Sequence, residues 1–277
     1  MAAYKRGDPI AVLGMSGVGK TRIAAMLRHD ADWFHYSIDY RIGTRYMNEA
    51  IVDNFKREAM KAPFLRDLLK SDSIYISSNI SFDNLDPLST YLGKPGNLDK
   101  GGIAFEDYIR RQREHRTAEI AALMDTPSFA RKAKAIYGYD HFICDTGGSI
   151  CEVVEPSDPD DAVLKKLSET CQIVYIESDA THTQALKARF DKSPKPMYYN
   201  EAFLRERWTD YLNKTGMTET QVDPDTFIRW AFEKLIEWRE PRYKAIADNW
   251  GVTIPAQAIE NVQTPKAFLD LVEGAAR

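Results

Sequence analysis

Eight consecutive residues near the N-terminus have the types and the spacing that hold a polyphosphate. They match the pattern G-x-x-x-x-G-K-[ST] in full and are Gly14, Met15, Ser16, Gly17, Val18, Gly19, Lys20 and Thr21. The glycines let main-chain N–H groups approach phosphate oxygens without interference from Cβ atoms. Lys20 is expected to reach the β and γ phosphates of a nucleotide, and the Thr21 hydroxyl to bind Mg²⁺. The motif therefore predicts that ATP and Mg²⁺ bind at these eight residues.

A second candidate metal ligand is the carboxylate at the end of a short apolar run. The run His141-Phe142-Ile143-Cys144 precedes Asp145, and Gly147 and Gly148 follow. A carboxylate at that edge of a sheet can hold Mg²⁺ directly or through water, and the two glycines allow the backbone to lie close to a ligand. The alternative is that Asp145 only caps the next turn.

Polar residues also follow the aromatic and apolar run 33–38. Asp39 is placed to orient or deprotonate an acceptor hydroxyl, and Arg41 to hold an anionic acceptor. Arg45 lies one helical turn beyond Arg41. Together with Gly147 and Gly148, these three residues are our candidate acceptor-binding set. A surface ion pair at a strand-to-helix corner is the alternative for Asp39 and Arg41.

Cations gather again before a proline-containing loop. Arg189, Lys192 and Lys195 fall in the segment 188–196, which also holds Pro194 and Pro196. Cations on such a loop suit a lid that closes over a transferring phosphoryl group. We assign Arg189 a catalytic and nucleotide-binding role, with a solvated basic loop as the alternative.

The order of elements must bring these residues to one place. Strands are expected at 10–13, 33–38, 141–145, 172–176 and 252–254. Helices are expected at 20–28, 44–60, 63–70, 103–125, 127–137, 159–169, 180–190, 198–214, 224–238, 241–249 and 265–273, and 72–78 is a short strand or loop. Strands alternating with helices predict an α/β fold with a doubly wound, mostly parallel sheet. We expect a nucleotide-binding core formed by 1–43 and 139–277, and a mostly helical acceptor or lid subdomain at 44–138.

Composition narrows the function classes. The chain has 277 residues, 44% of them hydrophobic and 28% charged, and a net charge of −4. This balance gives no general attraction to nucleic acid or to an anionic membrane. The sequence has no apolar signal region in its first ten residues and no apolar stretch long enough for a membrane span, so we expect a cytoplasmic protein.

Two residue patterns have an ordinary structural interpretation. The three cysteines lack CxxC spacing and the five histidines form no HxxxH pair, which argues against structural zinc and a disulfide framework. The basic run 110–116 alternates with acids at helical spacing. It is therefore expected to form a salt-bridged, solvated helix face rather than an RNA-binding surface.

In these motifs the chain resembles the shikimate kinase and gluconate kinase group of P-loop kinases, over roughly residues 1–40 and 143–277. The resemblance implies an acceptor-orienting role for Asp39, a glycine-rich end of the third strand at 145–148, a lid at Arg189 and an adenine-side segment at 242–248. The insertion 44–138 and the helical stretch 198–238 depart from that group. The order of parts also resembles uncharacterised bacterial proteins labelled as ATPases.

The leading hypothesis is an ATP- and Mg²⁺-dependent kinase that phosphorylates a hydroxyl of a small-molecule acceptor. A regulatory ATPase, whose nucleotide state is read by a protein partner, is the first alternative. A nucleotide or RNA kinase that uses the run 110–116 is the second. The identity of the acceptor, the preference for ATP over GTP and the oligomeric state stay open.

Overall fold

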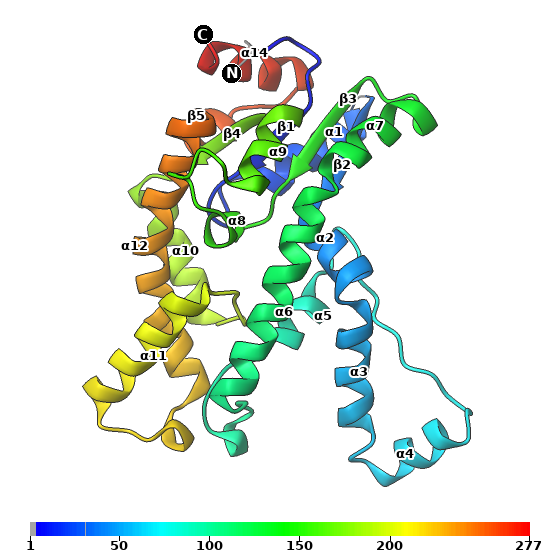
Figure 1. Ribbon diagram of the computed structural model, residues 1–277, viewed down its shortest axis with the longest axis vertical. Coiled ribbons are helices and arrows are strands. Elements are labelled where there is room, and N and C mark those ends of the chain that lie inside the picture. Colours follow the sequence, from blue (N-terminus) through cyan, green and yellow to red (C-terminus); the bar gives the residue numbers. More distant parts are fainter. Residues whose placement is uncertain (1–3, 31) are drawn as a thin grey trace.

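One five-stranded parallel sheet forms the centre of the protein (Figure 1). The computed structural model describes residues 4–30 and 32–277, so the first three residues of the expected N-terminal segment lie outside it. The strands are β1 (Ile10–Leu13), β2 (Trp33–Ser37), β3 (His141–Asp145), β4 (Gln172–Glu177) and β5 (Gly251–Pro255), in the spatial order β2-β3-β1-β4-β5. The expected α/β class with a parallel sheet is confirmed.

The strand order fixes where a ligand can bind. The chain leaves the central strand β1 towards β2 and returns to β3, then crosses to β4 and β5 on the other side. The connection that leaves β1 and the connection that leaves β3 therefore run in opposite directions across the sheet. Ligands of such sheets bind outside the carboxyl ends of the strands at the point where the direction changes, which here lies between β1 and β3. All four residues of β1 are fully buried, as a central parallel strand requires.

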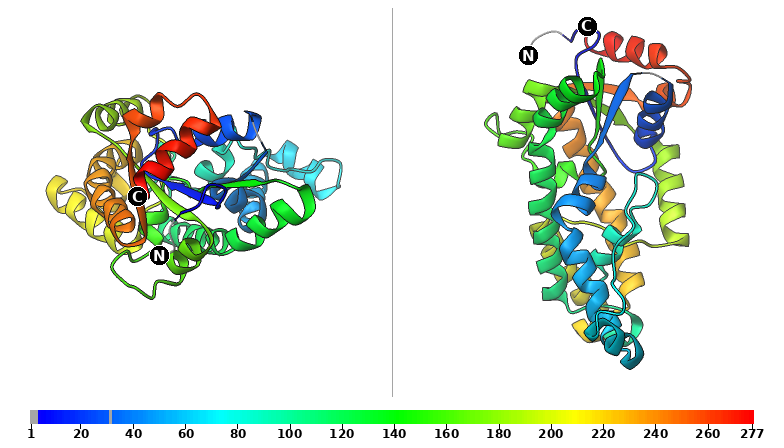
Figure 2. Two further views of the ribbon diagram at one scale, coloured as in Figure 1. Left: turned by 90° about the horizontal axis from the view of Figure 1, so that it is seen from above. Right: turned by 90° about the vertical axis from the view of Figure 1, so that its right-hand side faces the viewer.

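Helices cover both faces of the sheet, as the view from above shows (Figure 2). On one face α1 (Lys20–Asp30) packs on β2 and β3, and it contacts α14 (Pro265–Ala275), which packs on β5. On the other face α7 (Thr126–Tyr137) packs on β2 and β3 and contacts α9 (Ala162–Thr170), which packs on β4. No helix in the described part of the chain is both long and apolar enough to cross a membrane.

The segment 44–138 does not behave as one unit. It begins inside a π-helical turn (Ile42–Tyr46) that follows α2 (Ile38–Arg41). It contains α3 (Asn48–Ala59), α4 (Pro63–Lys70), α5 (Asp86–Leu92), a 3₁₀ turn (Leu98–Lys100), α6 (Phe105–Met124) and α7. Helices α3 and α4 project away from the sheet (Figure 1). The end of α6 instead packs at the sheet, where Tyr36 Oη donates to the carbonyl of Ala122 over 2.8 Å. A parallel crossover needs a helix against the sheet, so α7 and the end of α6 belong to the core.

The C-terminal part contains α8 (Ile150–Val153), α10 (Ala180–Lys192), α11 (Glu201–Thr215), a 3₁₀ turn (Glu219–Gln221), α12 (Pro224–Trp250) and α13 (Ala256–Glu260). The two helices expected at 224–238 and 241–249 are a single helix, α12, with Pro241 inside it. Buried side chains on both sides of the proline, Ile236 and Tyr243 among them, hold this helix against β4, β5 and α8. Tertiary packing therefore outweighs the local effect of proline.

Candidate functional site

The phosphate loop connects β1 to α1 at the carboxyl edge of the sheet. Gly14, Gly17 and Gly19 have φ values of 143°, 89° and 97°. Such values are rarely accessible to other residues, and a Cβ on Gly14 would lie 2.6 Å from the carbonyl oxygen of Ile176. Met15 and Val18 are buried and anchor the loop. The sequence therefore folds into a loop whose N–H groups are free to turn inward.

Lys20 lies under this loop. Its Nζ donates to the carbonyl oxygens of Gly14 and Met15 over 2.7 and 2.9 Å, and only 6% of the residue is exposed. Burial lowers the pKa of Lys20, and the charges of Asp145 and Asp39 oppose that shift. A cation is thus held at the mouth of the loop, facing two carboxylates.

Thr21 and Asp145 form the candidate metal site. Asp145 is the last residue of β3 and pairs in register with Val12 of β1, which places its carboxylate beside the loop. Thr21 Oγ1 donates to Asp145 Oδ2 over 3.1 Å, and the N–H of Gly147 donates to Oδ1 over 3.3 Å. A hydroxyl and a carboxylate in contact are a donor pair that suits Mg²⁺. The two residues assigned to the metal are therefore brought together.

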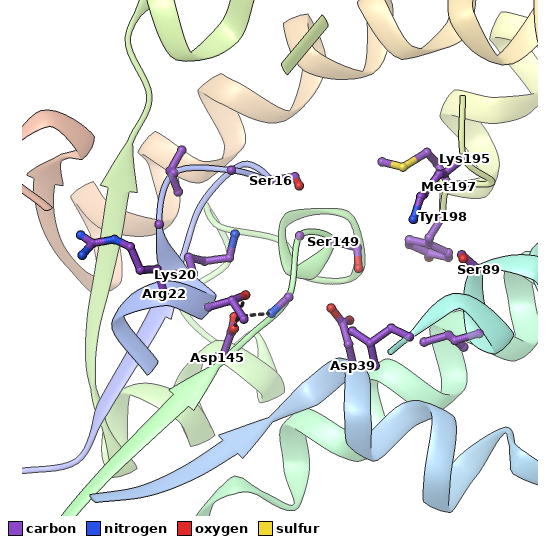
Figure 3. Close-up of a pocket in the computed structure, with 18 of the residues that line it drawn as sticks. Ser16, Lys20, Arg22, Asp39, Ser89, Asp145, Ser149, Lys195, Met197 and Tyr198 are labelled. Carbon is purple, nitrogen blue, oxygen red and sulfur yellow. Dashed lines mark hydrogen bonds between the residues drawn. The ribbon is translucent and has the colours of Figure 1, made fainter. Parts of the chain in front are cut away.

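Asp39 lies across the carboxyl edge of the sheet from the phosphate loop. It sits in the first turn of α2, immediately after β2, and its carboxylate is directed into the same space as Lys20 and Asp145 (Figure 3). Gly147 has a φ of 73°, and a Cβ there would lie 2.6 Å from Asp39 Oδ1, so both the backbone conformation and the close carboxylate favour glycine at this position. Burial and the charge of Asp145 raise the pKa of Asp39 to about 6, against the opposing charges of Lys20 and Arg239.

A cavity of about 1040 Å³ joins these groups. Figure 3 shows Ser16 and Lys20 on one side, Asp39 and Ser149 in the middle, and Ser89, Met197 and Tyr198 on the opposite side. Beyond Asp39 the walls come from α5 and from the segment that precedes α11, and they include Leu85, Leu88, Ser89, Leu92, Pro196, Met197 and Tyr198. Gly147 and Gly148 also line this cavity. We call this part of the cavity the acceptor side, after the candidate role of Asp39, and it is continuous with the glycine-rich loop.

Arg189 reaches the phosphate loop from the last turn of α10. Its guanidinium fills the space beside Gly17, where a Cβ would overlap with it. Lys195 lies at the cavity rim, where its Nζ is 3.1 Å from Asp86. The structure therefore places Arg189 beside the glycine-rich loop, whereas Lys195 lies across the cavity, near Met197 and Tyr198 (Figure 3).

Arg41 and Arg45 do not line the cavity, which corrects their assignment as acceptor-binding residues. Arg41 donates from Nε and Nη2 to Asp125 Oδ2 over 3.0 and 2.7 Å, and its guanidinium lies 4.9 Å from the centre of the Phe129 ring. Residues two apart on a helix do not share a face, so α2 turns Arg41 away from the space that Asp39 faces. Arg45 is exposed.

Replacement of Arg41 by alanine is expected to lower the free energy of unfolding by about 1 kcal/mol, because a partly buried ion pair and a cation–π contact are lost. Urea unfolding measures this change. In a double-mutant cycle with Asp125→Ala, the second replacement should have less effect once the first is made. Strictly additive effects would mean that the pair contributes nothing.

Sequence reasoning missed a set of buried polar residues on the acceptor side. His115, Glu119, Ser149, Glu152 and Arg239 are each 7% exposed or less. Within the run 110–116, which we interpreted as a solvated helix face, Gln112 and His115 are buried, so that interpretation holds only for the exposed positions Arg110, Arg113 and Arg116. The buried positions 108, 112, 115, 119 and 122 of α6 follow helical spacing, but three of them are polar residues, so the sequence alone did not show this buried face.

None of the residues 242–248, which the resemblance places on the adenine side, lines the cavity. Arg242 donates from Nε to the carbonyl of Cys151 over 2.7 Å and from Nη2 to that of Val154 over 2.6 Å, so it ties α12 to α8. The cavity on the far side of the phosphate loop is lined instead by Arg22, His182, Ile259, Glu260 and Gln263.

These features define an α/β protein with a glycine-rich phosphate loop and two carboxylates at one edge of a parallel sheet. No protein-family model matches the sequence, and no curated protein is significantly similar to it.

Proposed function

We propose that this protein is a P-loop kinase that transfers the γ-phosphoryl group of ATP to a hydroxyl of a small-molecule acceptor. The observation that carries the proposal is the cavity, which continues from the phosphate loop past Asp39 into a walled acceptor side. A nucleotide switch needs a phosphate loop and a metal site, but it has no use for a chamber beyond the γ-phosphate. A transferase needs both reactants held together.

Each residue has a role that follows from its position. Lys20 would leave the carbonyls of Gly14 and Met15 to neutralise phosphate charge, and Arg189 would add charge from the other side of the loop. Asp39 would accept the proton of the acceptor hydroxyl as that oxygen bonds to phosphorus. Mg²⁺ held by Thr21 and Asp145 would neutralise the charge that develops on the phosphate oxygens.

The direct test uses purified protein with ATP, Mg²⁺ and pooled small metabolites, followed by mass spectrometry for any species that gains one phosphoryl group. Lys20→Ala is expected to reduce product formation by about 10²-fold or more, because a buried cation facing the phosphates is lost. Lys244→Ala is the matched control, since Lys244 is exposed on α12. A product that forms equally with Lys20→Ala would contradict the proposal.

A regulatory ATPase is the second candidate, and one observation favours it. Phe64 on α4 is 74% exposed, and Tyr75, which follows α4 in the chain, is 88% exposed; α3 and α4 project away from the sheet (Figure 1). Exposed aromatic residues on or next to these projecting helices suit contact with a protein partner. Steady release of ADP with no phosphorylated product would favour this candidate.

The nucleotide or RNA kinase has less support from the same structure. Arg110 lies 2.7 Å from Glu114, and Arg113 lies 2.6 Å from Glu201. Cations that are already paired with acids make a weak surface for phosphate backbones.

A further inference from the structure

Three polar side chains form one connected group on the acceptor side of the cavity. His115 on α6 and Ser149 at the start of α8 line the cavity, and Glu119 lies behind both of them. Ser149 Oγ donates to the two carboxyl oxygens of Glu119 over 2.8 and 2.9 Å, and His115 Nδ1 lies 3.6 Å from Glu119 Oε2. Glu119 is fully buried and therefore acts on a ligand only through these two residues.

His115 is a buried polar group with unused hydrogen-bonding capacity. It is 4% exposed, it stacks on Tyr198 at 4.7 Å between ring centres, and its Nδ1 has no hydrogen-bond partner among the described residues. This unsatisfied Nδ1 faces Glu119 rather than the cavity, since it lies 3.6 Å from Glu119 Oε2. Because Nδ1 lies on the Glu119 side, the edge of the ring that carries Nε2 is left for the cavity.

The hydrogen bonds of this group can be counted. Ser149 uses its proton towards Glu119, so its oxygen offers only lone pairs to the cavity. Nδ1 lies 3.6 Å from Glu119 Oε2, which is beyond hydrogen-bond distance, and a small shift that brings a proton of Glu119 to Nδ1 would leave Nε2–H as a donor. One acceptor and one donor then face the same space, and a hydroxyl group satisfies both at once. A carboxylate has no proton for Ser149, and an ammonium has no lone pair for His115.

The charges agree with this count. Burial, with the charges of Asp39 and Glu152, raises the pKa of Glu119 well above its ordinary value, and burial lowers the pKa of His115 to about 3. Burial therefore favours the neutral form of both groups. Among the described residues, one arginine and one lysine line the acceptor side, and each has an acidic partner. Arg239 Nε lies 2.8 Å from Glu152, and Lys195 pairs with Asp86.

We propose that His115 and Ser149, held in position by Glu119, bind a second, uncharged hydroxyl group of the acceptor, so that the substrate is a neutral polyol. This inference rests on the proposed kinase function. The walls formed by Leu85, Leu88, Leu92 and Met197 contact the carbon skeleton. One hydroxyl lies at Asp39 and is phosphorylated, and another forms hydrogen bonds with His115 and Ser149.

The test compares acceptors that differ in charge. The protein is incubated with ATP and Mg²⁺ and with three separate pools: the polyols glycerol, xylitol and myo-inositol; the hydroxy acids glycerate, gluconate and shikimate; and the amino alcohols ethanolamine and serinol. A fourth sample contains a whole metabolite extract, and mass spectrometry identifies each phosphorylated product. A neutral polyol as the preferred acceptor supports the inference, whereas an acid or an amine overturns it and leaves the kinase function intact. If the extract and all the pools yield no phosphorylated species, the proposed function fails and this inference fails with it.

Variants then locate the contact on the acceptor that the first step identifies. His115→Phe keeps the ring stack and Ser149→Ala keeps the fold, and each should raise the acceptor KM by about tenfold or more with the KM for ATP changed less than about twofold. Thr117→Ala is the control variant, because Thr117 lies on the same helix as His115 but is exposed. It should leave the KM values for the acceptor and for ATP unchanged.

Glu119 is a positioning residue, so its test is rescue by a conservative variant. Glu119→Gln offers the same oxygen and an N–H in place of the proton, and it should recover most of the acceptor affinity that Glu119→Leu loses. Unchanged acceptor KM in His115→Phe and Ser149→Ala, with folding intact by circular dichroism, would overturn the subsite.

Discussion

Asp39→Asn is expected to lower kcat for phosphoryl transfer by about 10²–10⁴-fold while the Kd for ATP changes less than about twofold. The carboxylate lies against the backbone of Gly147, so an isosteric amide keeps the packing but is a far weaker proton acceptor. Rates are measured with the acceptor that mass spectrometry identifies, and ATP affinity by calorimetry. Asp140→Asn is the matched control, because Asp140 is an exposed carboxylate outside the cavity. Unchanged turnover in Asp39→Asn would remove the proton-accepting role that we assign to it.

The pH dependence gives an independent check on the same carboxylate. The pKa of Asp39 is raised to about 6, so the ionised form that accepts a proton is present above this pH and is lost as the pH falls through it. The kcat/KM of the wild-type protein should therefore fall about tenfold per pH unit below about pH 6. The residual activity of Asp39→Asn should lack this acidic limb. A limb that persists in the variant would belong to another group.

The parts of this site that follow from local sequence were predictable. The phosphate loop is a continuous motif, and the strands that end at Ser37 and Asp145 are short runs rich in aromatic and apolar residues whose carboxyl ends meet at one edge of a parallel sheet. Thr21 and Asp145 meet because the register of β1 and β3 leaves little choice. Local pattern and sheet geometry were sufficient here.

The parts that depend on distant partners were not predictable. Arg41 has the composition of an anion-binding residue, but Asp125, 84 positions away, accepts its hydrogen bonds. His115 lies in a strongly charged run, and only the packing of α6 against the rest of the fold reveals that this position is buried. The continuity of α12 through Pro241 depends in the same way on contacts with α8 and the sheet. A single sequence carries the residue types, whereas their pairing is a property of the assembled chain.

The ion pair between Arg239 and Glu152 is the interaction whose loss should affect stability most. Their side chains are 3% and 0% exposed, Arg239 Nε lies 2.8 Å from Glu152 Oε1, and Nη2 contacts the same oxygen. Glu152 Oε2 also accepts the N–H of Asn200 over 2.6 Å, so this carboxylate joins α8, α11 and α12. Glu152→Ala is expected to lower the free energy of unfolding by about 3–5 kcal/mol, because Arg239 would remain buried without its counter-charge. Urea unfolding followed by circular dichroism measures the change.

The double variant Glu152→Leu with Arg239→Met separates the missing charge from lost packing. It removes both charges and leaves apolar side chains of similar size, so it should be more stable than Glu152→Ala despite carrying one more replacement. Glu233→Ala is the matched control, since this glutamate is exposed on α12. A double variant that is less stable than Glu152→Ala would mean that the pair stabilises the fold by its own attraction and its hydrogen bonds. Arg239 also lines the cavity, so the same variants can be assayed for acceptor preference. If the pair contributes no net charge there, removing both charges should leave the preference between neutral and acidic acceptors unchanged.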